Sequence, residues 1–359
     1  MRPCGAGPHR TNTKENMSKR VLLTGGLGFI GSHTVEHWLK NTDWDIVVMD
    51  ALRFSGRIER LTDIDGYDPK RVEVVWHDLR SPVHPQLIEK LGNIDYIVNM
   101  ASDSHVDRSI THPVDFVQNN VNLVLNMLEY ARHIEPEKFI QVSTDEVYGP
   151  APLGHDHVEG EPHRPSNPYS ASKAAQEAIA YSYWRTYGVP ITITNTMNNF
   201  GERQHPEKYV PMVIRRIVNN ETIHVHGRPG DGDEWAWDIG SRVWLHARNH
   251  ADAVQYLLEN VDPIMYSDAE FTPDIQRFNV AGEQEINNLE IVKMIGDILN
   301  TTPKYEMVDY HTSRPGHDLR YSLDGSKLKE HGWTAPIGLE ESFKRTVLWT
   351  MEHKEWLTE

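Results

Sequence analysis

The residues best suited to do chemistry are a tyrosine and a lysine four positions apart, Tyr169 and Lys173. On a helix this spacing places both side chains on one face. A lysine ammonium beside a phenol favours the phenolate, so we expect Tyr169 to act as a base nearer neutral pH. Upstream, Asp145 and Glu146 form a pair of adjacent carboxyls after an apolar run. Together these residues predict an enzyme that moves protons.

A glycine-rich turn near the start of the chain predicts a dinucleotide site. The motif Gly26-x-Gly28-x-x-Gly31 follows an apolar run and opens a helical pattern, which is the context that this turn requires. Glycines let the backbone approach a pyrophosphate, and the helix N-terminus supplies N–H donors. Asp50, 19 residues after Gly31, can accept hydrogen bonds from a ribose 2′-hydroxyl and would repel a 2′-phosphate. The sequence therefore predicts NAD rather than NADP.

Further cofactor contacts are expected where the following strands end. Asp78 comes after a third apolar run and is placed to meet the adenine amino group, whereas Arg53 and Arg57 could hold a 2′-phosphate and leave NADP open. The set expected to bind the cofactor is Gly25, Gly28, Phe29, Ile30, Gly31, Asp50, Asp78, Leu79, Ala101, Tyr169 and Lys173.

Bulk properties narrow the function classes. The chain of 359 residues is long enough for two lobes. A net charge of −16 argues against general affinity for nucleic acid or an anionic membrane. Mean hydropathy is −0.57, and no apolar run approaches the roughly 18–20 residues of a membrane span. The single cysteine, Cys4, excludes an internal disulfide and favours a reducing compartment, so we expect a cytoplasmic protein.

Apolar runs alternate with helical patterns in the first half of the chain, which predicts a Rossmann-like doubly wound α/β fold with a parallel sheet. Strands are expected at 21–24, 45–50, 71–76, 94–100, 138–143 and 191–196, and helices at 28–40, 115–132 and 169–187. After Pro190 the pattern becomes irregular. We expect residues 17–196, with 240–262 returning, to form the cofactor domain, 197–239 and 263–359 a smaller mixed substrate-binding lobe, and 1–16 a disordered extension.

The helix predicted at 115–132 carries two apolar stripes. One contains Val117, Val121, Val124 and Leu128, and the other contains Phe116, Leu123, Met127 and Tyr130. One stripe should cover the sheet, and the other requires another helix of this chain or a second subunit. Together with the helix at 169–187, this favours a homodimer built on paired helices, with packing inside the chain as the alternative.

Several motifs resemble the extended short-chain dehydrogenase/reductase superfamily, and closely one branch of it, the nucleoside-diphosphate-glucose 4,6-dehydratases. The resemblance runs from about residue 19 to about 333 and rests on residues 104–109, 143–149, 167–174, 198–201, 206–208 and 314–318. The Tyr169 and Lys173 pair is shared across the superfamily, whereas Thr144-Asp145-Glu146 is much more specific to dehydratases.

This resemblance implies dehydration of a bound dTDP-glucose or UDP-glucose. Tyr169 removes the hydroxyl proton at carbon 4 while NAD⁺ takes the hydride, Glu146 removes the proton at carbon 5, and Asp145 protonates the departing hydroxyl of carbon 6. The hydride then returns to carbon 6, giving a 4-keto-6-deoxy sugar. Thr144 would hold the carbon 4 hydroxyl, and Lys173 the nicotinamide ribose. Adjacent carboxyls suit this division because like charges at close range raise one pKa.

The diphosphate of such a substrate needs cations. The resemblance implies a substrate-binding set of Ser104, Thr144, Asn199, Lys208, Arg242, Asn279, Arg314 and Tyr321. The segment 228–241 is longer and richer in glycine and tryptophan than is usual in the family. Trp235 and Trp237 could form a flap over the sugar, a base-stacking wall, a surface hairpin or a subunit contact.

Twenty histidines raise the hypothesis of a metal site. The densest pairs are His155-Asp156-His157 and His224-Val225-His226, but neither pair has i, i+4 spacing or a nearby cysteine, so we expect no metal. Two other functions stay open. One is another sugar-nucleotide enzyme, such as a 4-epimerase or an N-acetylhexosamine dehydratase, and the other is a non-catalytic NAD-binding sensor.

Overall fold

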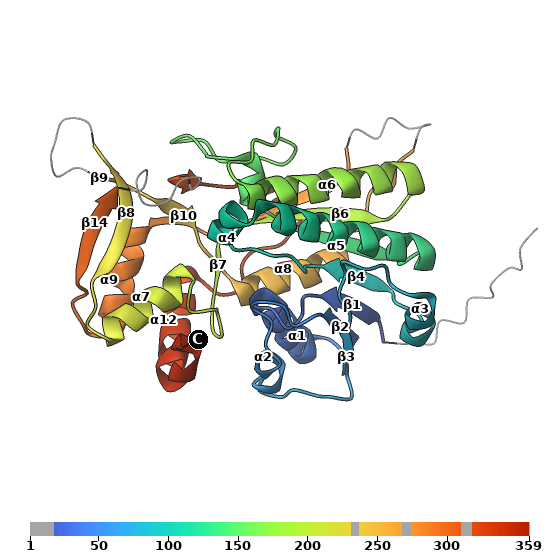
Figure 1. Ribbon diagram of the computed structural model, residues 1–359, viewed down its shortest axis with the longest axis horizontal. Coiled ribbons are helices and arrows are strands. Elements are labelled where there is room, and N and C mark those ends of the chain that lie inside the picture. The colour runs from blue at the N-terminus through green and yellow to red at the C-terminus, as the bar shows by residue number, and fades with distance from the viewer. Residues whose placement is uncertain (1–17, 231–236, 268–273, 310–317, 359) are drawn as a thin grey trace, which may run out of the picture.

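The computed structural model describes residues 18–230, 237–267, 274–309 and 318–358, and the extension expected at 1–16 lies outside them. Within these residues a seven-stranded parallel sheet has the order β12-β6-β5-β4-β1-β2-β3 (Figure 1). Its strands are β1 (Arg20–Thr24), β2 (Asp45–Asp50), β3 (Val72–Trp76), β4 (Tyr96–Asn99), β5 (Lys138–Thr144), β6 (Ile191–Thr196) and β12 (Gln276–Val280). The predicted Rossmann-like fold is confirmed.

One face of the sheet is covered by α3 (Pro85–Leu91), α5 (Pro113–Ile134) and α6 (Pro168–Tyr187). Leu123, Met127 and Tyr130 of α5 share a buried cluster with Tyr183 and Trp184 of α6. The stripe of α5 that required a partner is therefore covered by another helix of this chain, which is the alternative to a second subunit. This stripe gives no argument for a second subunit.

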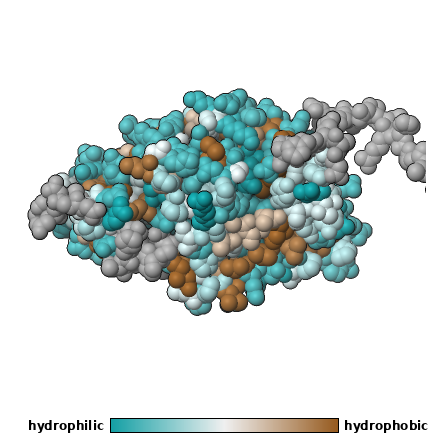
Figure 2. All heavy atoms as spheres, turned by 90° about the horizontal axis from the view of Figure 1, so that it is seen from above, coloured by the Kyte–Doolittle hydropathy of each residue, from teal (hydrophilic) through white to brown (hydrophobic). Residues whose placement is uncertain are grey.

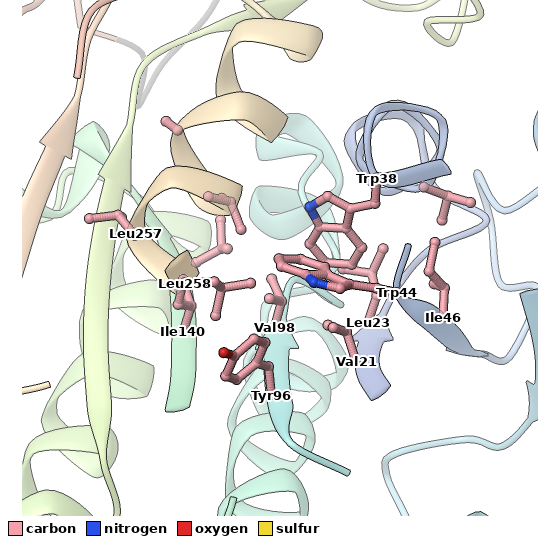
Figure 3. Packing of buried hydrophobic residues seen from close by; sticks show 14 of the residues in the cluster. Val21, Leu23, Trp38, Trp44, Ile46, Tyr96, Val98, Ile140, Leu257 and Leu258 are labelled. Carbon is pink, nitrogen blue, oxygen red and sulfur yellow. The ribbon is translucent and has the colours of Figure 1, made fainter. Parts of the chain in front are cut away.

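The opposite face is covered by α1 (Phe29–Asn41) and α8 (Ala247–Asn260). Side chains alternate along each strand, so Val21 and Leu23 of β1 point to this side while Leu22 joins the other cluster. Trp38 of α1 meets Trp44 edge to face, with ring centroids 5.6 Å apart (Figure 3). Burial of these two large rings fixes α1, and hence the turn that precedes it, against the sheet.

The return of the chain to the sheet is wider than expected. We predicted that only 240–262 return, but β12 also adds an edge strand beside β6. Its polar residues hide the strand in the sequence: Arg277 is buried against Glu177, and the Asn279 side chain donates to two backbone carbonyls. A strand whose buried polar groups find distant partners shows no apolar alternation.

The smaller lobe lies at the left of Figure 1 and contains short sheets and helices. Its strands are β7 (Asn199–Phe200), β8 (Ile223–Pro229), β9 (Trp237–Ile239), β10 (Ser241–Val243), β11 (Leu245–His246), β13 (Glu285–Asn287), β14 (Tyr305–Asp309) and β15 (Arg320–Tyr321), and its main helices are α7 (Tyr209–Val218), α9 (Asn288–Ile298) and α12 (Leu339–Glu352). β8 and β9 pair as a hairpin, with Trp237 opposite Pro229, which agrees with the hairpin hypothesis. Trp235 lies outside the described residues.

Short elements complete the chain: α2 (Glu59–Thr62), α4 (Val106–Thr111), α11 (Ser326–Glu330), and the 3₁₀ helices η1 (Asp145–Tyr148) and η2 (Lys354–Leu357). Among the described residues, none of the helices combines the length and the apolar character that crossing a bilayer requires.

The glycine turn gives the first testable prediction. A Cβ at Gly31 would lie 2.2 Å from the Gly25 carbonyl oxygen, whereas one at Gly338 would have its nearest neighbour, a Glu283 oxygen, at 3.6 Å. We expect Gly31→Ala to lower the free energy of unfolding by about 1–3 kcal/mol and to weaken NAD binding, because the turn must open. Urea unfolding and NAD titration would measure both. Equal behaviour of Gly31→Ala and the control Gly338→Ala would contradict this.

Candidate active site

The glycine turn forms a cradle at the carboxyl end of β1. Gly25 has φ +73°, a left-handed conformation that L side chains rarely adopt. The hydroxyl of Thr24 accepts hydrogen bonds from the N–H groups of Met100 and Ala101, each at 3.0 Å, and so joins the ends of β1 and β4. Phe29 begins α1 directly after the turn. An unobstructed backbone at a helix N-terminus fits a pyrophosphate, so the residues present suit NAD.

Asp50 braces this cradle. Its two carboxylate oxygens accept hydrogen bonds from the backbone N–H groups of Leu27 and Leu52, at 3.0 and 2.8 Å. Burial raises the pKa of the Asp50 carboxyl. Arg53 and Arg57 were the residues that could hold the 2′-phosphate of NADP, and both make contacts within the chain. Arg53 donates a hydrogen bond to the side chain of Asn119, and the Arg57 guanidinium lies 5.5 Å from the centre of the Trp356 ring. These contacts agree with the prediction of NAD.

The remaining predicted cofactor residues lie along the same edge of the sheet. Ile30 follows Phe29 in the first turn of α1 and is half-buried. Asp78 follows β3 and accepts from Arg80 at 3.0 and 2.9 Å, which lowers its pKa, and Leu79 beside it is buried. The site is thus assembled from the carboxyl ends of β1 to β4.

The predicted catalytic residues meet where β5 ends. Thr144 is the last residue of β5, and its backbone carbonyl accepts a hydrogen bond from Asn195 of neighbouring β6 at 3.1 Å. Its hydroxyl donates to Asp145 at 2.8 Å and is also hydrogen-bonded to Tyr169. One hydroxyl therefore links the acid pair, which is on η1, to the phenol, which is on α6.

The two adjacent carboxyls have different surroundings. Asp145 is 3% exposed, and its Oδ2 has no hydrogen-bond partner among the described residues. Burial raises the pKa of Asp145 to about 6. Glu146 is half-buried and accepts a hydrogen bond from Asn167 at 3.2 Å. We expected repulsion between the two charges to raise one pKa, but the structure assigns the increase to burial instead.

Tyr169 and Lys173 lie on α6, whose first turn is capped by Asn167. The expected lowering of the Tyr169 pKa by the lysine is not found. Burial and the charges of Glu146 and Asp145 raise the pKa of Tyr169, with only the Thr144 hydrogen bond opposing them. The Lys173 ammonium donates instead to the carbonyl of Val142 at 2.7 Å, and burial lowers its pKa to about 8.

Two predicted substrate residues lie near the acid pair. Three backbone carbonyls at 2.6–2.7 Å hold the guanidinium of Arg242, which stacks over the Tyr321 ring at 4.5 Å. The charge of Arg242 lowers the pKa of Asp145, although burial has a larger effect in the opposite direction. The charge of Glu146 raises the pKa of Tyr321. The fold therefore brings Arg242 and Tyr321 to the electrostatic neighbourhood of the acids.

Three other predicted substrate residues make contacts within the chain. The Lys208 ammonium lies 3.5 Å from the carbonyl oxygen of Ser104. The side-chain amide of Asn199 donates hydrogen bonds to the Thr196 hydroxyl at 3.1 Å and to the Met197 carbonyl at 2.9 Å. Ser104 and Lys208 are thus close together.

Asn279 does not fit its predicted role. It is fully buried in β12, and its amide donates to the carbonyls of His157 and Asp324, so it supports the chain rather than facing a ligand. Arg314 lies outside the described residues.

Sequence reasoning missed two asparagines that position the site. The side chain of Asn167 donates a hydrogen bond to Glu146. The side-chain amide of Asn195 donates to the carbonyl of Thr144 and, at 2.7 Å, to the buried carboxylate of Glu177. An asparagine before a predicted helix is a capping signal that could have identified Asn167. No local pattern marks Asn195, because its role depends on strand pairing.

Comparisons with known proteins identify the family of the chain. A sequence profile of the GDP-mannose 4,6 dehydratase family matches residues 22–346. The chain is 33% identical to a dTDP-glucose 4,6-dehydratase of Escherichia coli, over 94% of this chain and 95% of that protein. The structure resembles a Streptomyces venezuelae dTDP-glucose 4,6-dehydratase solved with NAD, at 32% identity and TM-score 0.80, covering 94% and 98% of the two chains.

A Thermus thermophilus UDP-glucose 4-epimerase solved with NAD is also similar, at 27% identity and TM-score 0.77, covering 92% and 99%. The predictions of an NAD cofactor and of a dehydratase-type lyase are confirmed by these relationships. The chain therefore belongs to the GDP-mannose 4,6 dehydratase family of the extended short-chain dehydrogenases/reductases.

Proposed function

We propose that this protein removes water from a nucleoside-diphosphate-glucose and yields the 4-keto-6-deoxy sugar nucleotide. The observation that carries this proposal is the link through Thr144, which connects the buried acid Asp145 to the phenol of Tyr169. NAD held in the glycine cradle would supply the redox chemistry, namely a hydride acceptor for carbon 4 and a hydride donor for carbon 6. The protein must supply a base, an acid and a second base for the remaining proton transfers.

Each proton transfer has a candidate residue. Tyr169, hydrogen-bonded to Thr144, takes the proton of the carbon 4 hydroxyl. Asp145 holds its proton to a pH of about 6 because it is buried, so it can protonate the departing hydroxyl of carbon 6. Glu146, which is more exposed, takes the proton at carbon 5 and gives a proton back to carbon 5 when the hydride returns to carbon 6. Lys173, directed by the Val142 carbonyl, binds the nicotinamide ribose.

The diphosphate would be bound by cations of the smaller lobe. Arg242 is held in one orientation by three carbonyls, and Lys208 lies beside Ser104. We divide the chain accordingly into an NAD-binding domain, to which β12 is added, and a substrate-binding lobe. The names of relatives such as the Escherichia coli enzyme favour dTDP over UDP as the nucleotide.

A 4-epimerase is the second candidate, because an epimerase shares the fold. Epimerisation needs no acid to expel a hydroxyl, so the buried Asp145, whose pKa is raised, favours dehydration. Incubation with dTDP-glucose, UDP-glucose and an N-acetylhexosamine nucleotide, followed by mass spectrometry and proton NMR of the product, decides between them. Loss of one water supports the proposal, whereas an unchanged mass with an inverted carbon 4 would support the epimerase.

We also propose a homodimer, on a different face of α5 from the buried stripe. Val114 and Leu125 are 65% and 38% exposed, and Val117 and Val121 between them are half-buried, so four apolar residues follow one outward face. The neighbouring exposed residues of α6 include the small Ala171 and Ala178, which permit close helix approach. Figure 2, which views the molecule from above α6, shows apolar side chains gathered in a band on this face.

Tyr169→Phe is expected to reduce the rate of the first hydride transfer by about 10²–10⁴-fold, because a positioned base contributes that much. NAD affinity should be retained, since the ring is preserved. Single-turnover absorbance of reduced nicotinamide measures the step. Tyr181→Phe, on the same helix, is the control. A normal rate in the Tyr169 variant would remove the phenol from the mechanism.

Asp145→Asn is expected to abolish dehydration and to stabilise the protein. The pKa of Asp145 rises from 3.8 to about 6 on folding, so ionising the buried carboxyl costs stability as pH rises between these values. The variant should therefore gain about 3 kcal/mol over the wild type at pH above 6, and less at pH near 5. Urea unfolding at several pH values measures the gain, with the exposed Asp65→Asn as control. A gain independent of pH would contradict burial as the cause.

Leu125→Lys combined with Val114→Lys is expected to convert the dimer to monomer, because two charges would face the partner helix. Light scattering measures the mass. Leu153, which is 95% exposed, offers the control Leu153→Lys. A wild-type protein that is monomeric at micromolar concentration would refute the dimer.

A further inference from the structure

Three metal-binding side chains converge on the segment between η1 and α6, apart from the proposed catalytic residues. His155 Nε2 lies 3.1 Å from Glu161 Oε1, and His157 Nδ1 lies 2.7 Å from Glu161 Oε2. The ligand atoms of all three residues lie within 4.8 Å of one another. The two imidazole rings are nearly perpendicular, with centroids 5.0 Å apart.

These distances are close to those of a metal site. Zinc ligands at about 2.0–2.1 Å in a tetrahedral arrangement are separated from one another by roughly 3.3–3.4 Å. The His155–Glu161 separation of 3.1 Å is already near this value, and the His157–Glu161 separation of 2.7 Å would open by about 0.6–0.7 Å when an ion lies between the two atoms.

The backbone that carries these residues is fixed by other parts of the chain. The N–H of His157 donates to Ser322 at 3.0 Å, and its carbonyl accepts from Asp324 at 2.9 Å. Arg320 donates to the carbonyl of His155 at 2.5 Å. Ligand residues that are held in advance lose less conformational entropy on binding an ion, so this arrangement favours binding.

We propose that His155, His157 and Glu161 bind one divalent transition-metal ion, with zinc as the preferred ion. Two imidazoles and a carboxylate suit zinc, whereas calcium and magnesium prefer oxygen ligands throughout. His157 is buried and His155 is exposed, so the ion would be held at the surface with an open position for water.

The place of this site in the fold points to a structural role. The ring of His157 stacks on Tyr148, the last residue of η1, with centroids 5.3 Å apart. An ion on His157 would therefore fasten the segment after the proposed acid pair, next to residues 322–324. The proposal requires nothing of the dehydration, because none of the three ligands belongs to the proposed catalytic set.

The histidine spacing led us to expect no metal. The His155-Asp156-His157 pair lacks a cysteine and the i, i+4 spacing of a helical site. The third donor, Glu161, comes close because the chain turns back through Gly160, which has φ +88°. The turn, rather than a helix, completes the site.

Zinc titration of chelator-treated full-length protein tests the proposal. We expect one zinc ion per chain by calorimetry, a higher melting temperature with zinc, and a visible spectrum of coordinated cobalt when Co²⁺ replaces zinc. His155→Ala and Glu161→Gln should each remove the saturable binding, the melting shift and the cobalt spectrum. Because His155 is exposed, its variant should fold normally, which circular dichroism and NAD binding would verify.

His224→Ala is the matched control. His224 is an exposed histidine whose Nε2 lies 2.8 Å from the Glu306 carboxylate. It therefore makes a similar histidine–carboxylate contact outside the proposed site. Its removal should leave binding unchanged. Absence of saturable zinc binding to the wild type, or equal binding by the His155→Ala, Glu161→Gln and wild-type proteins, would overturn the proposal.

Discussion

The hydroxyl of Thr144 is the interaction on which the site depends. It donates to Asp145 and is bonded to Tyr169, so it joins groups that come from η1 and α6. Its own position is set by strand pairing, since the amide of Asn195 holds the carbonyl of Thr144 and is itself held by the buried Glu177. A disturbance of this network would change the distance between acid and phenol without touching either.

Unequal burial gives the two adjacent carboxyls different chemistry. Residues that follow one another in a chain differ little in sequence context, but the turn of η1 directs Asp145 inward and leaves Glu146 half-buried. Desolvation raises the pKa of the first, and a hydrogen bond from Asn167 supports the charge of the second. The same desolvation acts on Tyr169, where it outweighs the benefit that we expected from the nearby lysine.

Burial of polar groups also explains where the sequence predictions failed. β12 was not recognised because Arg277 and Asn279 interrupt its apolar pattern, although both are buried and hydrogen-bonded to distant parts of the chain. Asn279 was taken for a nucleotide contact for the same reason: a polar residue near a family motif resembles a ligand contact until its burial is known. In α5, by contrast, the buried stripe was identified correctly, and only its partner, the helix α6, required the structure.

The sequence by itself determined the parallel α/β core, the dinucleotide turn, the helix that bears Tyr169 and Lys173, and the acid pair, because each depends on periodicity or on residues adjacent in the chain. The tertiary structure decided the protonation preferences of Asp145 and Tyr169, the support from Asn195 and the convergence of His155, His157 and Glu161. These properties depend on desolvation and on contacts between elements distant in sequence, or on a turn that reverses the chain. Local patterns do not encode such distances.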